Sequence, residues 1–325
     1  MIEALLQDVE RDYEQLRAAN EREEAYRRER IKNEQPDIYQ LVKEREELIL
    51  GTVREIVNGG SDINDLPEKM EQLSASIRNK LAEKGFPPDY LAPVYHCPVC
   101  KDTGKTGELV KEYCACLKKA YQQKLREKIG LIGNQRETFD TFDLSLFPDE
   151  IMPGETFSQR EQMQLIREDC REWAERYPYA ASRDIVLSGK SGLGKTFLLR
   201  AMAERLIERD VNVLIISAYR MLEILREAYF NQKDDTEDLL DAQVLMIDDL
   251  GTEPMMQSVT VEQLFNLLNE RQNRGLSTVI STNLDMTKFR ERYTERIASR
   301  LTDLRHCMIL NLTGKDIRTS RRENR

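Results

Sequence analysis

One stretch of the sequence has the residues and spacing of a phosphate-binding loop. Residues 189–196 read GKSGLGKT, a complete G-x-x-x-x-G-K-T motif, and the apolar run DIVLS comes directly before it. In such a loop the glycines let backbone N–H groups surround phosphate oxygens, the lysine reaches the β- and γ-phosphates, and the threonine hydroxyl binds Mg²⁺. A plain strand-to-helix turn would explain neither the lysine nor the threonine. We expect a nucleotide site that uses the whole loop, with Lys195 also catalytic: Gly189, Lys190, Ser191, Gly192, Leu193, Gly194, Lys195 and Thr196.

Two carboxylates end a second apolar run. The sequence VLMIDD finishes at Asp248 and Asp249. Next to a phosphate loop, this is the pattern in which one aspartate holds Mg²⁺ through water and the other polarises the attacking water. We expect Asp248 and Thr196 to bind magnesium and Asp249 to be the catalytic base, with Glu253 as a second candidate for the base. Without the phosphate loop, a core strand with a polar exit turn would be the simpler interpretation.

A third polar position follows the next apolar run, which ends Ser281-Thr282-Asn283. A polar side chain at the carboxyl end of a parallel strand can contact the γ-phosphate or the attacking water. Asn283 is therefore a catalytic candidate, and capping of the loop is the alternative. The sequence contains no Asn-Lys-x-Asp motif for reading guanine, so we expect ATP and not GTP.

Two arginines lie four residues apart in the run ERIASRL, at Arg296 and Arg300. On a helix this spacing places them on one face. An arginine that reaches the γ-phosphate of a neighbouring subunit can act as an arginine finger, and Arg300 is the candidate for that catalytic role. Ordinary salt bridging on a charged helix surface is the competing interpretation.

Four cysteines form a pattern typical of a structural metal site. Cys97-x-x-Cys100 and Cys114-x-Cys116 are separated by thirteen residues, a spacing from which four thiolates can surround one Zn²⁺ tetrahedrally. Redox-active or unrelated cysteines are the alternative. His96 is expected to lie near the metal or on the surface, and Cys170 and Cys307 to be buried. Gly104-Lys105-Thr106 in the same stretch resembles the end of a phosphate loop, but Val99 replaces the first glycine, so we expect a turn there.

The composition limits the function. The 325 residues carry a formal net charge of −9, so nucleic acid can be contacted only through local basic patches and not over the whole surface. The first residues, MIEALLQDVERDYEQL, are acidic where a signal peptide would be basic, and no apolar run reaches membrane-spanning length. We expect a cytoplasmic protein without a membrane partner, in a reducing compartment where cysteines are thiols or metal ligands.

Two kinds of hydrophobic pattern divide the chain. Helical spacing recurs over residues 2–16, 38–57 and 70–81, and a charged helix is expected over 117–129. After about residue 130, short β-rich runs alternate with helices, at 185–188, 211–217, 244–247, 278–281 and 308–312, which predicts an α/β domain with a parallel sheet. We expect a helical partner-binding region over 1–90, a four-cysteine zinc module with a connecting helix over 91–130, and an ATPase domain over 131–325.

These motifs, in this order, resemble the AAA+ ATPases of the DnaC/DnaI helicase-loader and IstB group over roughly residues 135–318. The segment CPVCKDTG…CAC resembles the zinc module of DnaI-like loaders. The resemblance implies a P-loop AAA+ (ASCE) fold and equivalent roles: Lys195 and Thr196 in the phosphate loop, Asp248 and Asp249 in the second motif, Asn283 as first sensor and Arg300 as finger. Arg318 is a candidate second sensor. Only seven residues follow it, which leaves minimal or no room for a helical lid.

The resemblance also implies a function. We expect a slow, Mg²⁺-dependent ATPase, stimulated by DNA or a partner, that self-associates through its ATP sites and places a hexameric replicative helicase on single-stranded DNA. The alternatives are an IstB-like transposition-targeting ATPase, which should lack the cysteines, an ATP-binding switch or scaffold with little turnover, and a small-molecule kinase. Phe139, Phe142 and Phe147 either contact adenine or pack a linker on the core, and Trp173 is expected in the core.

Overall fold

The computed structural model describes residues 2–57, 65–107, 110–131, 137–231, 236–253, 257–301 and 303–320. The chain divides into two compact units, one of residues 8–117 and the other of residues 1–7 together with 118–325. The boundary therefore lies near the start of helix α4 (Ala115–Lys128). The finer three-region division at residues 90 and 130 stays a prediction.

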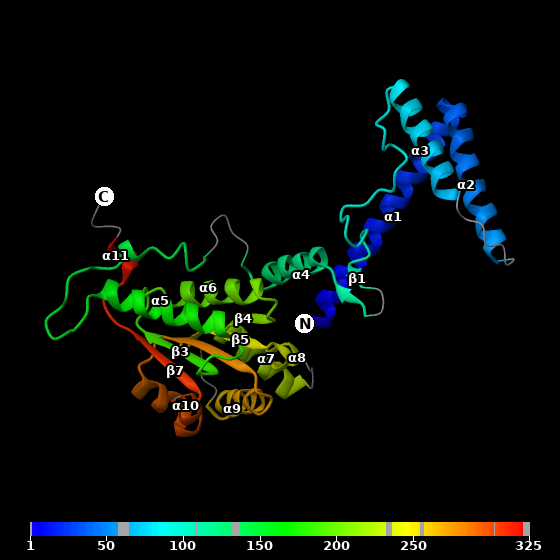
Figure 1. The fold of residues 1–325 in the computed structure, drawn as a ribbon. Helices are drawn as coiled ribbons and strands as arrows, with labels where there is room; N and C mark the ends of the chain where they lie inside the picture. Colours follow the sequence, from blue (N-terminus) through cyan, green and yellow to red (C-terminus); the bar gives the residue numbers. More distant parts are fainter. Residues whose placement is uncertain are drawn as a thin grey trace. The chain divides into compact units, whose positions relative to one another are not determined.

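The unit of residues 8–117 is mainly helical, as predicted (Figure 1). It contains α1 (Ile2–Glu34) from residue 8 onward, α2 (Pro36–Val57), α3 (Leu66–Glu83) and a small hairpin of β1 (Lys105–Thr106) and β2 (Glu112–Tyr113). A compact apolar core holds the helices together, and its buried members are Ile31, Ile38, Val42, Ile77 and Leu81. The segment Asn58-Gly59-Gly60, which we expect to end the second helix, lies outside the described residues.

The second unit is built on a five-stranded parallel sheet with the order β4-β5-β6-β3-β7. Its strands confirm the five predicted β-rich runs, with ends that differ by at most three residues: β3 (Asp184–Gly189), β4 (Val213–Ser217), β5 (Val244–Leu250), β6 (Ser277–Thr282) and β7 (Cys307–Leu312). Because parallel strands end at one edge, the loops after β3, β5 and β6 meet there. β6 lies between the strand of the phosphate loop and the strand of the two aspartates.

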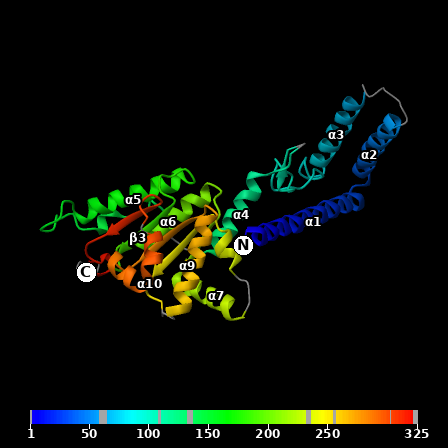
Figure 2. The same ribbon diagram turned by 90° about the horizontal axis from the view of Figure 1, so that it is seen from below.

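Helices cover both faces of the sheet (Figure 1, Figure 2). α5 (Gln159–Arg176) and α6 (Lys195–Glu208) pack on one face, against a core that includes Ile185 and Leu187. α7 (Ala218–Asn231), α9 (Gln257–Asn273) and α10 (Met286–Leu301) pack on the other, against a core that includes Val186. Alternate side chains of β3 thus enter different cores, which explains why residues 185–187 in its middle are all apolar. The remaining short helices are η1 (Leu144–Leu146), α8 (Glu237–Asp241) and α11 (Ile317–Ser320).

The aromatic residues and the two remaining cysteines are buried in these cores. Phe142 stacks on Phe147 with ring centroids 5.6 Å apart, and Phe139 is also buried, so the segment before α5 packs on the core. Contact of these rings with adenine stays a prediction. Trp173 is in the core as predicted and donates from Nε1 to the carbonyl of Ser182 at 2.7 Å. Cys170 and Cys307 are buried as expected. No helix of the described residues combines the length and the apolar character needed to cross a membrane.

Candidate nucleotide site and four-cysteine centre

The phosphate loop joins β3 to α6 in the predicted context. Gly194 caps the N-terminus of α6 with φ +87°, and a Cβ there would lie 3.4 Å from the ring of Phe142. Gly192 has φ +78°, and a Cβ there would lie 1.8 Å from a carboxylate oxygen of Asp316. Both positions favour glycine because of the backbone conformation, and at Gly192 the neighbouring carboxylate adds a close contact. The loop ends at the N-terminus of a 14-residue helix, where free N–H groups and the helix dipole favour a phosphate group.

Lys195 is held inside the loop by three oxygens. Its Nζ donates to the carbonyls of Gly189 at 2.6 Å and Lys190 at 2.8 Å, and to Oδ1 of Asn283 at 2.7 Å. Burial lowers the pKa of Lys195, and the negative charges of Asp249 and Asp248 act in the opposite direction. The positive charge of Lys195 therefore lies at the edge of the sheet where β3 and β6 end.

Asp248, Thr196 and Ser281 form the part of the site suited to Mg²⁺. Thr196 Oγ1 lies 3.1 Å from both carboxylate oxygens of Asp248, so a hydroxyl and a carboxylate converge, and these are the hard oxygen ligands that Mg²⁺ prefers. Ser281 Oγ donates to Asp248 Oδ1 at 2.5 Å and accepts from the backbone N–H of Asp249 at 2.9 Å. Ser281 was not singled out by sequence reasoning, because its role depends on β5 and β6 being neighbours.

Asp249 and Asn283 meet beside the lysine. Asp249 is exposed and has φ +58°, a left-handed conformation that is uncommon outside glycine. The side-chain Nδ2 of Asn283 lies 3.3 Å from Asp249 Oδ1. The amide of Asn283 thus accepts from Lys195 on one side and donates to Asp249 on the other.

Glu253, the second candidate for the base, is engaged elsewhere. Its side chain is buried, and its Oε2 accepts from the backbone N–H of Gly251 at 2.7 Å. Its other oxygen accepts from the hydroxyl of Tyr293, and the guanidinium Nε of Arg292 lies 3.6 Å away. We therefore assign Glu253 a structural role: it fixes the loop after Asp249 against α10.

Arg318 lies against the phosphate loop. Its Nη2 donates to Ser191 Oγ at 2.6 Å, and the backbone N–H of Ile317 donates to the carbonyl of Gly192 at 3.1 Å. The segment after β7 thus closes over the loop, which is where a second sensor would have to be. Together with Arg318, the C-terminal residues Arg321 and Arg322 are candidates for contact with single-stranded DNA, and these two lie outside the described residues.

Arg300 is not brought to the nucleotide site of its own chain. It lies in the last turn of α10, and its Nη1 donates at 3.0 Å to Oε1 of Gln272 at the end of α9. The carbonyl of Gln272 in turn accepts from Arg183, the residue directly before β3. Arg300 therefore lies near the amino ends of the strands, whereas the nucleotide site lies at their carboxyl ends. A six-residue strand separates these two edges by about 20 Å.

The four-cysteine centre has the geometry of a zinc site. The sulfur atoms of Cys97, Cys100, Cys114 and Cys116 all lie within 4.8 Å of one another. The pair Cys97–Cys114 is 3.9 Å apart and the pair Cys100–Cys116 is 3.4 Å apart. Tetrahedral zinc with Zn–S bonds of about 2.3 Å would place its sulfurs roughly 3.8 Å apart, so the residues fit this metal.

A buried carboxylate supports the first pair of cysteines. Asp102 is 1% exposed and accepts from the backbone N–H groups of His96 at 2.8 Å and Cys97 at 2.7 Å, and from Asn20 of α1 at 2.9 Å. His96 is largely exposed and contacts Asp102 at 3.5 Å, outside the cysteine cluster, as expected. Lys105 and Thr106 form strand β1, so the predicted turn is part of a hairpin.

Comparison with known proteins finds a family match for part of the chain. Residues 165–325 match the family described as IstB-like ATP binding protein. The chain is 25% identical to the replicative helicase loader DnaI of Bacillus subtilis, over 75% of this chain and 82% of the relative. It is 28% identical to the replicative helicase loader DnaC of Escherichia coli, over 36% of this chain and 49% of the relative. An insertion sequence IS21 putative ATP-binding protein of Pseudomonas aeruginosa is 27% identical over 50% of this chain and 63% of the relative.

Two solved structures have similar chains. A crystal structure of DnaI is 25% identical, covers 59% of this chain and 99% of its own, and has a TM-score of 0.41. A crystal structure of the DnaC helicase loader is 18% identical, covers 54% of this chain and 98% of its own, and has a TM-score of 0.43.

Proposed function

Because residues 165–325 form an ATP-binding domain of the IstB/DnaC family, we propose that this protein is a cytoplasmic ATPase that loads a hexameric replicative helicase onto single-stranded DNA. The observation that carries the proposal is the extent of the likeness to DnaI. It covers 75% of the chain, whereas residues 131–325 are only 195 of the 325. The likeness therefore continues into the region before the ATPase domain, where the cysteines lie.

The nucleotide site supports ATP hydrolysis with the following division of labour. The loop from Gly189 to Thr196 holds the phosphates of ATP, and Lys195 neutralises charge on the β- and γ-oxygens. Thr196 and Asp248 hold Mg²⁺, which when bound offsets negative charge on the phosphates. The exposed Asp249 orients and polarises the attacking water. Asn283 contacts both Asp249 and Lys195 and holds them in position relative to each other. Turnover is slow until DNA or the helicase partner engages the protein.

The position of Arg300 favours a site shared between two chains. Arg300 lies at the edge of the sheet opposite to its own nucleotide site. In a head-to-tail oligomer the same surface would face the next chain's site, so Arg300 acts as an arginine finger in trans. Self-association through the ATP sites follows from this arrangement.

The helical unit with its zinc-stabilised centre is the part we propose to bind the helicase. It has its own core and can hold a partner independently of ATP turnover. Within it, residues 1–90 supply the binding region and 91–130 the zinc module and connecting helix, ahead of the ATPase domain of 131–325. A transposition-targeting role is the second candidate, favoured by the likeness to the IS21 protein, but that likeness covers only half of the chain.

The two functions are separated by a binding experiment with the full chain. The purified replicative helicase of the same organism is passed with this protein over a size-exclusion column, with and without ATP. A loader co-elutes with the helicase, and the Cys100→Ser variant does so less. No co-elution under any nucleotide condition would exclude the loader function and leave the transposition-type role.

A further inference from the structure

The guanidinium of Arg300 is held by two side chains of α9, and we propose that these two residues, Phe265 and Gln272, are positioning residues that aim Arg300 at the neighbouring chain's nucleotide. The inference rests on the proposed function, in which Arg300 acts in trans. It adds the groups that fix the orientation of Arg300 before a neighbouring chain arrives.

Phe265 provides the surface on which Arg300 lies. The guanidinium carbon of Arg300 is 4.8 Å from the ring centroid, and that of Arg296 is 5.4 Å from the same ring. These distances are within the range of cation–π attraction. Within the described residues, Arg300 forms no ion pair with a carboxylate. Its orientation is therefore set by the ring and not by the salt bridging expected of a solvated helix face.

Gln272 orients Arg300 without neutralising it. The 3.0 Å bond runs from Nη1 of Arg300 to the neutral amide oxygen of Gln272. A glutamate at this position would hold the arginine more strongly, but it would also cancel the charge that a finger offers to the transferring phosphate. A neutral acceptor fixes the direction and leaves the full positive charge available.

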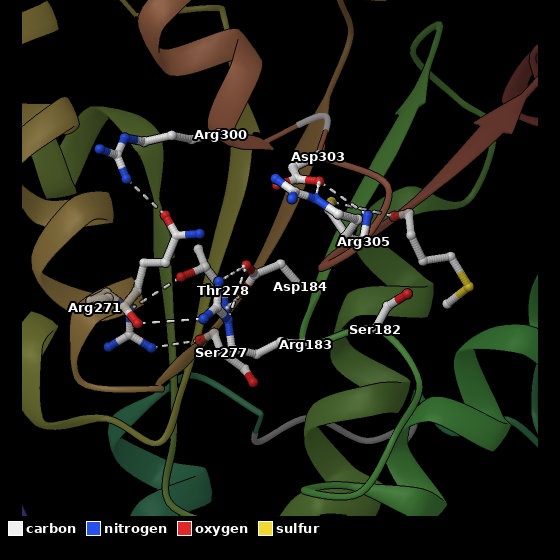
Figure 3. A network of polar contacts seen from close by, with 12 residues as sticks. Ser182, Arg183, Asp184, Arg271, Ser277, Thr278, Arg300, Asp303 and Arg305 are labelled. Atoms are coloured by element: carbon white, nitrogen blue, oxygen red, sulfur yellow. Dashed lines mark hydrogen bonds and ion pairs between the residues drawn. The ribbon is translucent and has the colours of Figure 1, made fainter.

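The backbone of Gln272 is joined to a network of polar contacts at the amino edge of the sheet. Figure 3 shows this network around Arg183, Asp184, Arg271, Ser277 and Thr278. The preceding residue, Arg271, is fully buried, and burial lowers its pKa to about 10, so it remains charged at neutral pH. Its guanidinium donates to four oxygens at 2.5–3.2 Å, from Leu239, Ala242, Ser277 and Thr278.

The carbonyl of Gln272 is fixed from the other side. It accepts from Nη1 of Arg183 at 3.4 Å, and Arg183 is paired with Asp184 at 2.9 Å. Asp184 also accepts from the backbone N–H of Thr278 at 2.8 Å. The end of α9 is therefore tied to the first residues of β3 and β6, and the backbone that carries the side-chain acceptor for Arg300 is fixed in place.

The test measures ATP turnover of assembled full-length variants. Gln272→Ala and Phe265→Leu should each lower kcat about tenfold and leave KM for ATP unchanged, since they touch only the orientation of the finger. Phe265→Tyr keeps the ring and should keep the activity. Asn273→Ala, an exposed change at the next residue of α9, is the matched control and should be neutral. Gln272→Glu should lower kcat at least as much as Gln272→Ala, whereas a merely structural role would be satisfied by glutamate.

Mixing experiments locate the defect in one half of the shared site. Equal parts of Asp249→Asn and Gln272→Ala should give about a quarter of wild-type turnover, because about a quarter of random head-to-tail interfaces join an intact phosphate loop to an intact finger. Equal parts of Arg300→Ala and Gln272→Ala should give only about a twentieth, because every finger is then defective. The Arg300→Ala and Asp249→Asn mixture, which tests the trans finger alone, should also recover about a quarter.

The outcomes separate the two claims. If the Arg300→Ala and Asp249→Asn mixture recovers but Gln272→Ala and Phe265→Leu are fully active, the positioning role is wrong and the trans finger stands. The positioning role is also wrong if the activity lost in Gln272→Ala and Phe265→Leu does not return when each variant is mixed with Asp249→Asn. It is wrong too if Gln272→Glu is as active as wild type. If the Arg300→Ala and Asp249→Asn mixture stays inactive although the chains co-assemble, the trans finger fails, and the inference fails with it.

Discussion

The side-chain oxygen of Asn283 lies 2.7 Å from the ammonium nitrogen of Lys195. This hydrogen bond ties the end of β6 to the phosphate loop, and the nitrogen of the same amide lies 3.3 Å from Asp249. One side chain thus connects Lys195, which we propose neutralises phosphate charge, with Asp249, which we propose polarises water. On this proposal, Asn283 is the residue through which the state of the phosphates can influence Asp249.

Replacing Asn283 should therefore affect hydrolysis more than binding. Asn283→Ala should lower kcat by about 10²-fold, in the range seen when one positioned polar group is removed from an active site. The dissociation constant for ATP should change little, because the loop and Lys195 remain. Steady-state ATPase kinetics and nucleotide titration measure the two effects, with the exposed Asn311→Ala as control. A loss confined to ATP affinity would contradict this role.

The closure of the C-terminal segment over the phosphate loop gives a second prediction. Gly192→Ala would place a methyl group 1.8 Å from the carboxylate of Asp316, so that carboxylate would have to move. It would then release the backbone N–H of Arg318, and the contact of Arg318 with Ser191 would be weakened. We expect ATP affinity to fall at least about tenfold through strain and displacement.

The control for this change is Gly154→Ala. Gly154 also has a positive φ, +91°, but no atom lies within 4 Å of the added Cβ. Backbone strain alone should not affect ATP binding there. Equal effects of the two substitutions in an ATP titration would show that the contact with Asp316 does not matter.

The four-cysteine centre predicts about one zinc ion per chain, since four thiolates complete one tetrahedral shell. Elemental analysis of protein purified without chelator measures it. Cys100→Ser and Cys114→Ser should each lose the metal, and strong chelation should unfold the 8–117 unit while ATP binding persists. Val99→Ser, an exposed change between two of the ligands, should keep the zinc. Metal-free protein from such a preparation would exclude the assignment.

The net charge of −9 predicts weak binding to single-stranded DNA that depends on local basic residues. The affinity should increase with ATP, when chains align, and should fall linearly on a logarithmic salt scale with a slope of about −0.7 per phosphate contacted. Fluorescence anisotropy with a labelled oligonucleotide, in a salt series from about 50 to 200 mM, measures both effects. Salt-independent affinity, or no binding with or without ATP, would count against a loader.

The features predicted from the sequence are mostly local. Each is recognised within a run of fewer than ten residues that has one clear period. They are the phosphate loop, the Asp248-Asp249 pair and the five strands. The first helix is longer than its apolar pattern, and continues to Glu34. Pairs four apart, such as Arg27 with Glu23 and Arg30 with Glu34, help to sustain it where few apolar residues point to a core.

The features that sequence reasoning missed depend on which elements become neighbours. Ser281 and Asp248 are 33 residues apart, and their contact requires β6 to lie beside β5. Gln272 contacts Arg300 only because α9 and α10 share one face of the sheet. Glu253 was a candidate for the base because it follows the two aspartates in sequence. Its burial against Tyr293 could be known only from the packing of α10.

The most direct test of the proposed function is a loading assay on closed circular single-stranded DNA, which an assembled helicase ring enters only if it is opened. The helicase bound to the circles is quantified after gel filtration, with the full-length protein and ATP, and with the Lys195→Ala variant. We predict that the wild-type protein raises the amount of helicase on the circles several-fold, whereas Lys195→Ala does not. No increase with wild-type protein that binds ATP and the helicase would contradict the proposed function.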